Sequence, residues 1–274
     1  MKDGMLEFKD APMFGRVMRN EELCKQVLEV ILNIEIDHIE YLNTEQEMSA
    51  YNDAKGVRLD VYLKASDKVF DIEMQTTIEP FLGKRIRYYQ SSLDSTLLDR
   101  GETYDMLLES YVIFICSYDP YGFNIPIYTL ERTCVETPDV VVHNDSHWLI
   151  LNAKAWNKDT DKARSNLLQY IQSSKVGQDS LTQAISDEVD RNNSDSEWRR
   201  NAMGFMTVEH SHRVELRAAR QEGIEIGLAE GLREGEARNK ALIDKLLADD
   251  RIDDLKRSTT DEAFCNQLYE EYGL

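Results

Sequence analysis

Long apolar runs are missing from this sequence of 274 residues. The longest, residues 111–116, has the length of a buried strand and falls far short of the roughly 18 to 20 residues that a membrane-spanning helix needs. The first residues, Met-Lys-Asp-Gly-Met, lead directly into mixed polar sequence, which predicts that no signal peptide is present. We therefore expect a cytoplasmic protein with no membrane partner.

Cysteines with metal-ligand spacing are missing too. The four cysteines lie far apart, at positions 24, 116, 134 and 265, and form no CxxC pair, so reduced thiols are expected. His143 and His147 flank Asp145, yet no further cysteine or histidine lies close to them in the sequence. This pattern favours a structural loop over a zinc site.

Positive charge is scarce. The sequence has 32 lysines and arginines against 51 acidic residues, which gives a formal net charge of −19. Because nucleic-acid-binding proteins neutralise phosphates with lysine and arginine, this balance excludes a general polyanion binder and argues against a nucleic-acid substrate. A local basic patch remains compatible with the composition, since net charge does not determine where the charges lie.

Hydrophobic periodicity predicts one helix, then several strands, then mostly helices. Asn20 is a suitable N-cap for the first helix, and Gly101 is a suitable stop after the second. Predicted helices occupy residues 20–33, 80–99, 162–173 and 180–191, and predicted extended segments occupy residues 34–48, 57–64, 69–75, 111–117, 125–135 and 147–151. This order is typical of an α/β or α+β domain with a mixed sheet.

The sequence changes character near residue 157, after which helical patterns continue to the C-terminus. Within the charged segment 208–247, glycines recur every four residues, at positions 223, 227, 231 and 235. Each glycine costs a helix about 1 kcal/mol relative to alanine, so this helix needs a partner surface or is only marginally ordered. We predict a helical extension over residues 157–207 and an oligomerisation tail over residues 208–274, and a flexible spacer is the alternative.

Two runs with strand periodicity stand next to each other. In residues 57–64 and again in residues 69–75, apolar and polar side chains alternate, with turn residues between them. A turn at Ser66 and Asp67 sets the register of a hairpin in which apolar residues face apolar residues, for example Val61 opposite Ile72. The period of two therefore predicts one apolar face and one polar face.

On the polar face, this register places Asp60 directly opposite Glu73. Directly opposed side chains have Cβ atoms roughly 4.5–5.5 Å apart, where like charges destabilise a sheet. Two such carboxylates favour a cation, a shared proton or a basic neighbour, and Mg²⁺ commonly uses protein carboxylates together with water and phosphate. Gln75 projects on the same side and can orient an attacking water or contact a phosphate. The alternative is a solvated hairpin face on which Arg58 compensates the charge of Asp60.

Asp60 and, thirteen residues later, Glu73-Met74-Gln75 resemble the signature of the PD-(D/E)XK nuclease superfamily. Longer stretches resemble its recombination-promoting nuclease and transposase branch and cover most of residues 8–155: MFGRVMRNEELCKQVLEVIL, KGVRLDVYLK, FDIEMQ, KRIRYYQSSLD and GETYDMLLESYVIFIC. The resemblance implies a restriction-endonuclease-like αβββαβ core with a mixed sheet over residues 1–156, followed by a C-terminal helical region. It also implies cleavage of DNA with Mg²⁺ or Mn²⁺.

By the same resemblance, Asp60 and Glu73 are the expected metal ligands, and Glu22 on the first helix is a candidate third carboxylate. Gln75 occupies the position of the superfamily's lysine, where it replaces a positive charge with a neutral amide. This departure leaves the source of the positive charge open.

The helix of residues 80–99 carries the best candidate for a DNA-binding patch. Lys84 and Arg87 are three residues apart on one helix face, with Gln90 close by, and such a face can position a phosphate backbone. A solvated helix face is the alternative. Lys84, or Lys64 in the hairpin, is also a candidate for the charge that the site lacks.

The sequence therefore predicts a metal-dependent DNA endonuclease that associates with itself through its tail. Two alternatives stay open. The first is a catalytically degenerate nuclease fold that binds DNA or protein, which Gln75 and the acidic balance favour and the intact pair of Asp60 and Glu73 opposes. The second is an oligomeric scaffold whose function lies in the tail.

Overall fold

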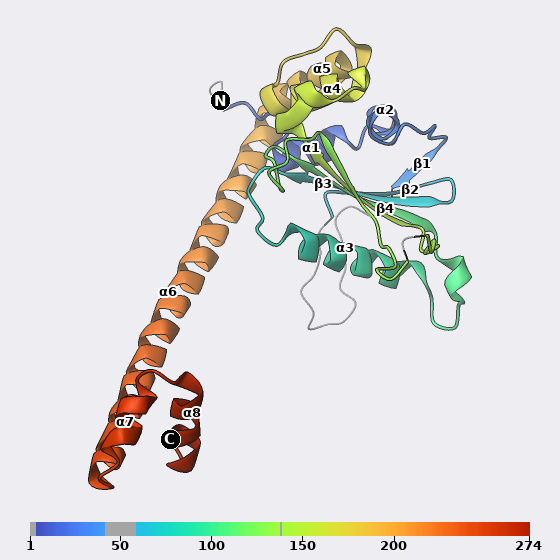
Figure 1. The fold of residues 1–274 in the computed structure, drawn as a ribbon. Helices are drawn as coiled ribbons and strands as arrows, with labels where there is room; N and C mark the ends of the chain where they lie inside the picture. The colour runs from blue at the N-terminus through green and yellow to red at the C-terminus, as the bar shows by residue number, and fades with distance from the viewer. Residues whose placement is uncertain (1–3, 42–58, 138) are drawn as a thin grey trace. The chain divides into compact units, whose positions relative to one another are not determined.

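The computed structural model describes residues 4–41, 59–137 and 139–274, and for residues 209–222 it describes the backbone only. The chain divides into two compact units, Met1–Phe205 and Met206–Leu274. The larger unit contains a mixed sheet with helices on both faces, and the smaller unit is helical (Figure 1). The predicted extended segment 34–48 is described only as far as residue 41, and its remainder lies outside the described residues.

The described strands form one sheet with the order β1-β2-β3-β4-β6-β5. The strands are β1 (Ile39–Tyr41), β2 (Val61–Ala65), β3 (Lys68–Gln75), β4 (Glu109–Cys116), β5 (Ile127–Leu130) and β6 (Ser146–Asn152). β3, β4 and β6 run parallel to one another, whereas β1 and β2 at one edge and β5 at the other are antiparallel to their neighbours. The sheet is therefore mixed, as predicted.

Helices cover both faces of this sheet (Figure 1). α1 (Ala11–Val17), α2 (Glu21–Leu32), α4 (Lys162–Ser173) and α5 (Ser180–Ser194) lie on one face, and α3 (Leu82–Leu97) lies on the other. Two short 3₁₀ helices, Tyr104–Met106 and Ala153–Lys158, precede β4 and follow β6. The order α2, β1, β2, β3, α3, β4 is the αβββαβ order that the resemblance implied, which confirms the predicted fold class.

The first predicted helix has the ends that its sequence indicated. The Asn20 side chain caps α2 by accepting a hydrogen bond from the Leu23 N–H, and Asn33 ends the helix in the left-handed conformation with φ 55°. The shorter α1 has no counterpart among the predicted helices. It spans seven residues, with a proline in its first turn, and is too short to show a periodic pattern of apolar residues.

β2 and β3 form the predicted hairpin. Val61 pairs with Ile72 and Leu63 with Phe70, which confirms the predicted register. The turn takes the two residues between the strands, where Ser66 adopts φ 55°. Side chains of β3 therefore alternate between the two layers of helices, with odd-numbered residues facing α3.

The start of β2 corrects the prediction that Asp60 lies within a strand. The described part of β2 begins at Val61, so Asp60 lies immediately before it. The Asp60 N–H donates to the side chain of Glu73. The pairing of β2 with β3 ends at Val61 and Ile72, one residue short of the predicted pair.

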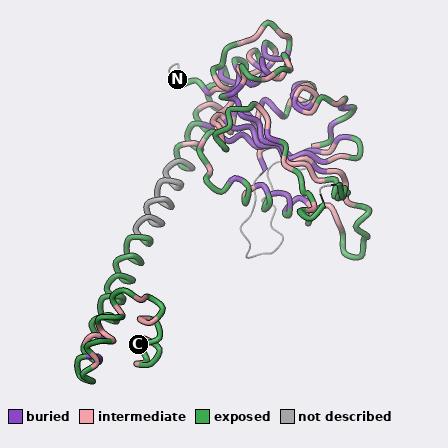
Figure 2. Tube along the Cα trace, viewed as in Figure 1, coloured by how far each residue is buried: buried purple, intermediate pink, exposed green. Residues whose placement is uncertain are grey.

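α3 packs its apolar stripe onto the sheet. Leu82, Ile86 and Leu93 recur at helical spacing and contact a buried cluster that includes Val112 and Phe114 of β4. Figure 2 shows the burial along the strands and on the sheet side of α3. Burying each such side chain contributes about 1.5–3 kcal/mol. This packing fixes the rotation of α3 about its axis and decides which of its polar side chains face the sheet.

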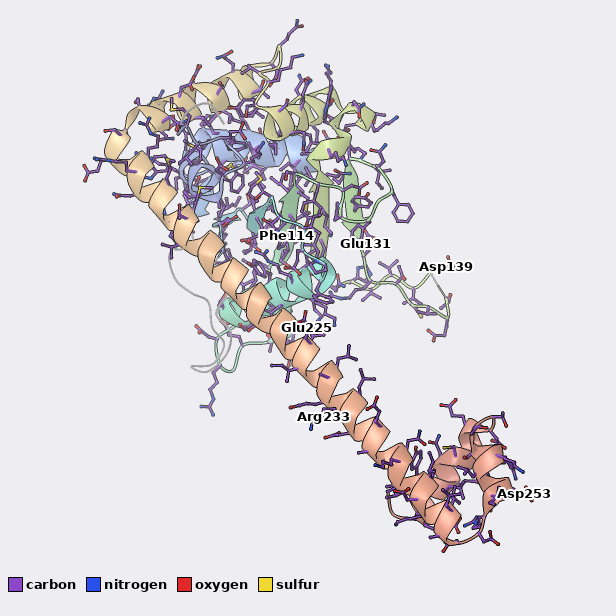
Figure 3. The ribbon with its side chains drawn as sticks, turned by 90° about the vertical axis from the view of Figure 1, so that its left-hand side faces the viewer. Phe114, Glu131, Asp139, Glu225, Arg233 and Asp253 are labelled. Carbon is purple, nitrogen blue, oxygen red and sulfur yellow. The ribbon has the colours of Figure 1, made fainter. Side chains whose placement is uncertain are left out.

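The smaller unit contains most of α6 (Ser196–Ala248), together with α7 (Ile252–Ser258) and α8 (Glu262–Glu271). Leu242, Leu246 and Leu268 form its buried core. Residues 223–240 of α6 are all exposed, and Figure 3 marks Glu225 and Arg233 on this stretch. The predicted long helix and the helical cap after it are confirmed. Among the described residues, no helix combines the length and the apolar character that crossing a membrane requires.

Candidate active site

Three predicted site residues meet where β2 begins and β3 ends. Glu73 and Gln75 are two residues apart on β3, so both face α3, and they are 2% and 8% exposed. Asp60 lies opposite Glu73, immediately before β2. The structure thus brings Asp60, Glu73 and Gln75 together on the sheet face that α3 covers.

Asp60 and Glu73 are held against each other through the backbone. The Asp60 N–H donates to Oε1 of Glu73 at 2.8 Å, and the Met74 N–H donates to Oδ2 of Asp60 at 3.0 Å. Each carboxylate therefore accepts an N–H from the opposite arm of the hairpin. These two bonds fix the carboxylates at the end of the hairpin without using α3.

Arg85 of α3 brings a positive charge into this group. Its Nη1 donates to Oε1 of Gln75 at 2.6 Å, and its Nη2 donates to Oε2 of Glu73 at 3.1 Å and to the Tyr89 hydroxyl at 2.7 Å. The guanidinium also lies over the rings of Tyr89 and Phe114, 5.0 and 5.2 Å from their centroids. Burial alone would lower the pKa of Arg85, but Tyr89 and Glu73 raise it, so the side chain stays charged.

Both polar ends of Gln75 are engaged. Its Oε1 accepts from Arg85, and its Nε2 donates to the backbone carbonyl of Thr77. The amide oxygen and nitrogen are thereby held in one orientation. Gln75 is therefore a fixed acceptor for Arg85 in this structure.

Asp71 adds a third carboxyl. It lies two residues before Glu73 on the same face of β3, is 0% exposed, and neither of its oxygens has a hydrogen-bond partner among the described residues. Burial and the charge of Asp60 hold the pKa of Asp71 well above its usual range, against the opposing charge of Arg85. Burial and the neighbouring Asp60 and Asp71 likewise raise the pKa of Glu73. We refer to Asp60, Asp71, Glu73, Gln75 and Arg85 as the hairpin site.

The donor set of the hairpin site fits a hard divalent cation. Carboxylate oxygens are the ligands that such ions prefer, and both oxygens of the fully buried Asp71 lack a hydrogen-bond partner among the described residues by geometric criteria. Asp60 and Glu73 are the residues that would hold the ion. Within the described residues, no cluster of three or more potential ligands is in place, so water and substrate oxygens would complete the coordination.

Glu22 and Lys64 do not join the hairpin site. Glu22 is exposed on α2, on the sheet face opposite to α3, where its carboxylate accepts from Gln26 Nε2 at 2.6 Å. Lys64 pairs with Val69 near the turn of the hairpin, at the other end from Asp60. Neither residue brings its charge to the carboxylates in this conformation.

The three predicted substrate-contacting residues of α3 differ in their surroundings. Lys84 and Arg87 are exposed, and the Lys84 ammonium lies over the Phe81 ring, 5.4 Å from its centroid. Gln90 is 3% exposed; its amide nitrogen donates to Ser110 and its oxygen accepts from the Trp148 indole N–H. Lys84 and Arg87 are thus available at the surface, whereas Gln90 is part of the core between α3 and the sheet.

Sequence reasoning misses Arg85 and Asp71. Arg85 lies three residues after Leu82 and four before Tyr89, so it borders the buried stripe of α3, and helical periodicity could have found it. Asp71 shares the face of Glu73 by simple alternation along the strand. Both signals are present in the sequence, but each also fits a solvated surface.

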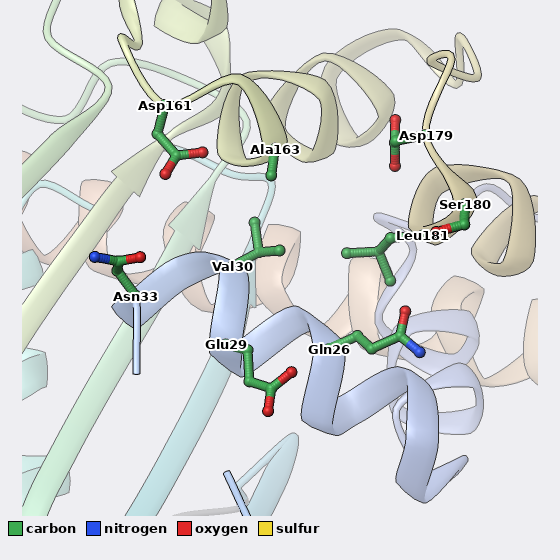
Figure 4. A pocket seen from close by; sticks show the side chains of 9 residues that line it. All are labelled: Gln26, Glu29, Val30, Asn33, Asp161, Ala163, Asp179, Ser180 and Leu181. Atoms are coloured by element: carbon green, nitrogen blue, oxygen red, sulfur yellow. The ribbon is translucent and has the colours of Figure 1, made fainter. Parts of the chain in front are cut away.

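A cavity of about 340 Å³ lies apart from the hairpin site, between α2 and the N-terminal ends of α4 and α5 (Figure 4). Val30 and Leu181 give it apolar walls. Asp161 and Asp179 also line it, but their carboxylates already cap α4 and α5 by accepting backbone N–H groups. These helices lie on the sheet face opposite to α3, so the cavity does not include the paired carboxylates.

Comparison with protein families gives one clear result. The sequence matches the family model described as PD-(D/E)XK nuclease family transposase over residues 6–173, which is more than half of the chain. The matched residues include every described strand, α3 and the whole hairpin site. Comparisons with curated proteins and with solved structures gave no match.

Proposed function

The chain belongs to the PD-(D/E)XK nuclease family transposases, and on that basis we propose that it is a metal-dependent endonuclease that hydrolyses DNA phosphodiester bonds. The family supports a nuclease-like function. Our proposal adds DNA as the substrate and Mg²⁺ or Mn²⁺ as the ion. It rests on the chemistry of the hairpin site.

The observation that carries the proposal is the pairing of Asp60 with the buried carboxyl of Glu73 at the end of the hairpin. Asp60 and Glu73 would hold the ion. When bound, such an ion polarises a phosphoryl oxygen and lowers the pKa of a water molecule. The backbone N–H groups of Asp60 and Met74 keep the two carboxylates in place. Gln75, expected from the sequence to orient a water or contact the phosphate, acts instead through Arg85, which its amide oxygen holds.

The exposed face of α3 supplies a place for the phosphate backbone. Lys84 and Arg87 lie on this helix beside Arg85, which reaches into the hairpin site. Basic side chains of this kind position a nucleic acid without reading its sequence. A local patch next to the carboxylates answers the objection that the chain as a whole is acidic.

The test is cleavage of supercoiled plasmid in the presence of Mg²⁺ or Mn²⁺. We expect Glu73→Gln and Asp60→Asn each to slow cleavage by about 100-fold or more. Either change removes a ligand of the ion, and the ion compensates the negative charge of the transition state. Glu188→Gln is a matched control because Glu188 also bonds an arginine, Arg191, but lies on α5 on the other face of the sheet. The control should cut like the wild type, and EDTA should stop cleavage in every active variant.

Two outcomes would contradict the proposal. Cleavage that survives both Glu73→Gln and Asp60→Asn would place the activity elsewhere. A folded protein that binds DNA but does not cut it would favour the alternative of a degenerate nuclease fold that acts as a binding module. Gln75 in the lysine position and the occupation of Glu73 by Arg85 are the observations that favour this alternative.

We also propose that the tail mediates self-association. Residues 223–240 of α6 are exposed and include Ile224, Leu228 and Leu232, which recur every four residues beside the glycines. A shortened chain that ends at residue 207 should lose oligomers in sedimentation analysis while it keeps cleavage. If it kept the oligomers, the tail would not be the contact. If it lost cleavage together with the oligomers, the scaffold alternative would gain support.

A further inference from the structure

The guanidinium of Arg85 bridges the two predicted site residues of β3. Nη1 binds the amide oxygen of Gln75 at 2.6 Å, and Nη2 binds the carboxylate of Glu73 at 3.1 Å. The Tyr89 hydroxyl accepts a further bond from Nη2 at 2.7 Å. Arg85 is therefore held from three sides at the end of β3.

A phosphodiesterase needs positive charge where the reaction gathers negative charge. Gln75 is neutral, so the residue in the lysine position does not provide it. Within the described residues, Lys84 lies over the Phe81 ring and Lys64 lies near the turn of the hairpin, and neither contacts Glu73. Arg85 is the cation that the structure brings into direct contact with Glu73 and Gln75.

We propose that Arg85 contacts the phosphate that is cut and supplies the positive charge of the site, and that Gln75 is a positioning residue that holds Arg85. This inference rests on the proposed nuclease function. It assigns to two residues, from two different elements, the task of one lysine on β3. It also gives Gln75 a specific role, as the acceptor that aims a guanidinium.

The geometry leaves Arg85 able to reach a substrate. Three of its N–H donors are engaged by Gln75, Glu73 and Tyr89, and the described residues supply no partner for the others. Its side chain is 31% exposed, whereas that of Glu73 is 2% exposed. The Arg85 side chain is therefore partly open to solvent beside the buried carboxyl of Glu73, so that a phosphate oxygen can approach it.

The identity of residue 75 agrees with this arrangement. A lysine at position 75 would place a second cation against the Arg85 guanidinium, whereas the glutamine oxygen accepts its Nη1. Arginine also suits the task better than lysine would, because its planar fork can bind a carboxylate and an amide and still present an N–H outward. Gln75 and Arg85 are thus complementary to each other.

The experiment compares Arg85→Gln, the double variant Gln75→Lys/Arg85→Gln, and the control Arg191→Gln on the exposed surface of α5. Plasmid cleavage is measured with Mg²⁺ and Mn²⁺. DNA affinity is measured with EDTA over a range of salt concentrations, and Tm is recorded for each protein. We expect Arg85→Gln to slow cleavage by about 100-fold and to lower the slope of log affinity against log salt by about one, as the loss of one phosphate contact should.

The double variant separates a role in charge from a role in folding. If Arg85 supplies the charge, a lysine at position 75 should restore cleavage at least about tenfold over Arg85→Gln, as it returns a cation to the site. The proposal would be overturned if the double variant recovered no cleavage and Arg85→Gln kept the wild-type salt slope. Cleavage by Arg85→Gln at the wild-type rate would also overturn it. If Arg85→Gln does not fold, Arg85→Lys is measured in its place. It keeps the positive charge and should therefore keep the wild-type salt slope. A lower slope would overturn the proposal.

Failure of the proposed function is distinguishable from failure of this inference. If the wild type binds DNA but does not cut it, the proposed nuclease function fails, and the salt slope alone decides whether Arg85 contacts phosphate. If the wild type cuts and the salt slope and rate of Arg85→Gln equal those of the wild type, only the role of Arg85 fails. If neither the wild type nor any variant binds DNA, both the proposed function and the role of Arg85 are overturned.

Discussion

The backbone N–H of Asp60 donates a hydrogen bond of 2.8 Å to Oε1 of Glu73. This contact joins two residues whose carboxylates repel each other, because both are negatively charged. Oδ2 of Asp60 is held in turn by the Met74 N–H at 3.0 Å. The hairpin thus keeps two carboxylates together by its backbone, which is the arrangement that a cation would stabilise.

The first prediction concerns stabilisation by the metal. Mn²⁺ or Mg²⁺ should raise the Tm of the wild type, because an ion at 100 times its Kd stabilises the folded state by about 2.7 kcal/mol. For a unit of this size, 1 kcal/mol corresponds to roughly 2–4 °C in Tm. Differential scanning fluorimetry with and without the ion measures the shift.

Asp60→Asn is the variant that tests this prediction, and Asp67→Asn in the hairpin turn is its control. Asp67 is 81% exposed in its side chain and lies at the other end of β2 and β3. The shift should disappear in Asp60→Asn and remain in Asp67→Asn. An equal shift in both variants would mean that the ion binds elsewhere.

The hairpin register could be predicted because it depends on local rules. A period of two assigns each side chain to a face, and the two-residue turn assigns each partner, so Val61 opposite Ile72 follows from the sequence. The hydrogen bond from the Asp60 N–H to the Glu73 side chain, just before β2 begins, did not follow. A contact between a backbone group and a side chain leaves no trace in the hydrophobic pattern.

The role of Arg85 was missed for a different reason. Lys84, Arg85 and Arg87 are neighbours in the sequence, and composition does not distinguish them. Arg85 turns toward the sheet because the contacts of Leu82 and Ile86 with the strands fix the rotation of α3. Contacts between residues far apart in the sequence thus decide which cation enters the site and which ones stay exposed.

The second prediction concerns pH and Glu109 at the start of β4. Glu109 accepts hydrogen bonds from Lys68 and from the Tyr111 hydroxyl, and His147 Nε2 lies 3.1 Å from its Oε1. Burial opposes these contacts but they prevail, so the pKa of Glu109 is lowered below 4.5. A lowered pKa means that the stabilisation is present above the ordinary pKa and is lost as the pH falls through the folded-state pKa.

Glu109→Gln should therefore lower the Tm at pH 7 and have less effect as the pH falls below about 4. We expect a cost of about 1 kcal/mol, because the bonds are charge-assisted but the group is partly exposed to solvent. Circular dichroism melts from pH 3 to pH 8 measure it. A Tm difference that stays constant over this range would contradict an ionic role for Glu109.

The third prediction concerns the thiols. Burial raises the pKa of Cys24 to about 12 and that of Cys116 to about 12, whereas Cys134 and Cys265 are partly exposed. Because the thiolate is the reactive form, a thiol reagent at pH 8 should modify Cys134 and Cys265 in the native protein. Cys24 and Cys116 should react only after unfolding in guanidinium chloride. Rapid reaction of all four native thiols would contradict the packing of α2 and β4.

The last prediction decides between the two interpretations of the glycines in α6. Apart from the chain neighbours and the nearby backbone of the helix itself, no described atom lies within 4 Å of a Cβ added at Gly227 or Gly231, so alanine meets no obstacle in a single chain. Each replacement should stabilise an isolated helix by about 1 kcal/mol. A flexible spacer would therefore gain helicity and keep its assembly state in Gly227→Ala/Gly231→Ala.

A contact face would respond in the opposite way, because small residues let two helices approach closely and added methyl groups keep them apart. Under the proposed self-association, sedimentation of Gly227→Ala/Gly231→Ala should show a mass that falls toward 31.7 kDa, the mass of one chain. Glu230→Ala, an exposed site on the same helix, is the control and should assemble like the wild type. An unchanged mass for the glycine variant, combined with higher helicity, would establish the spacer and remove the glycines from any interface.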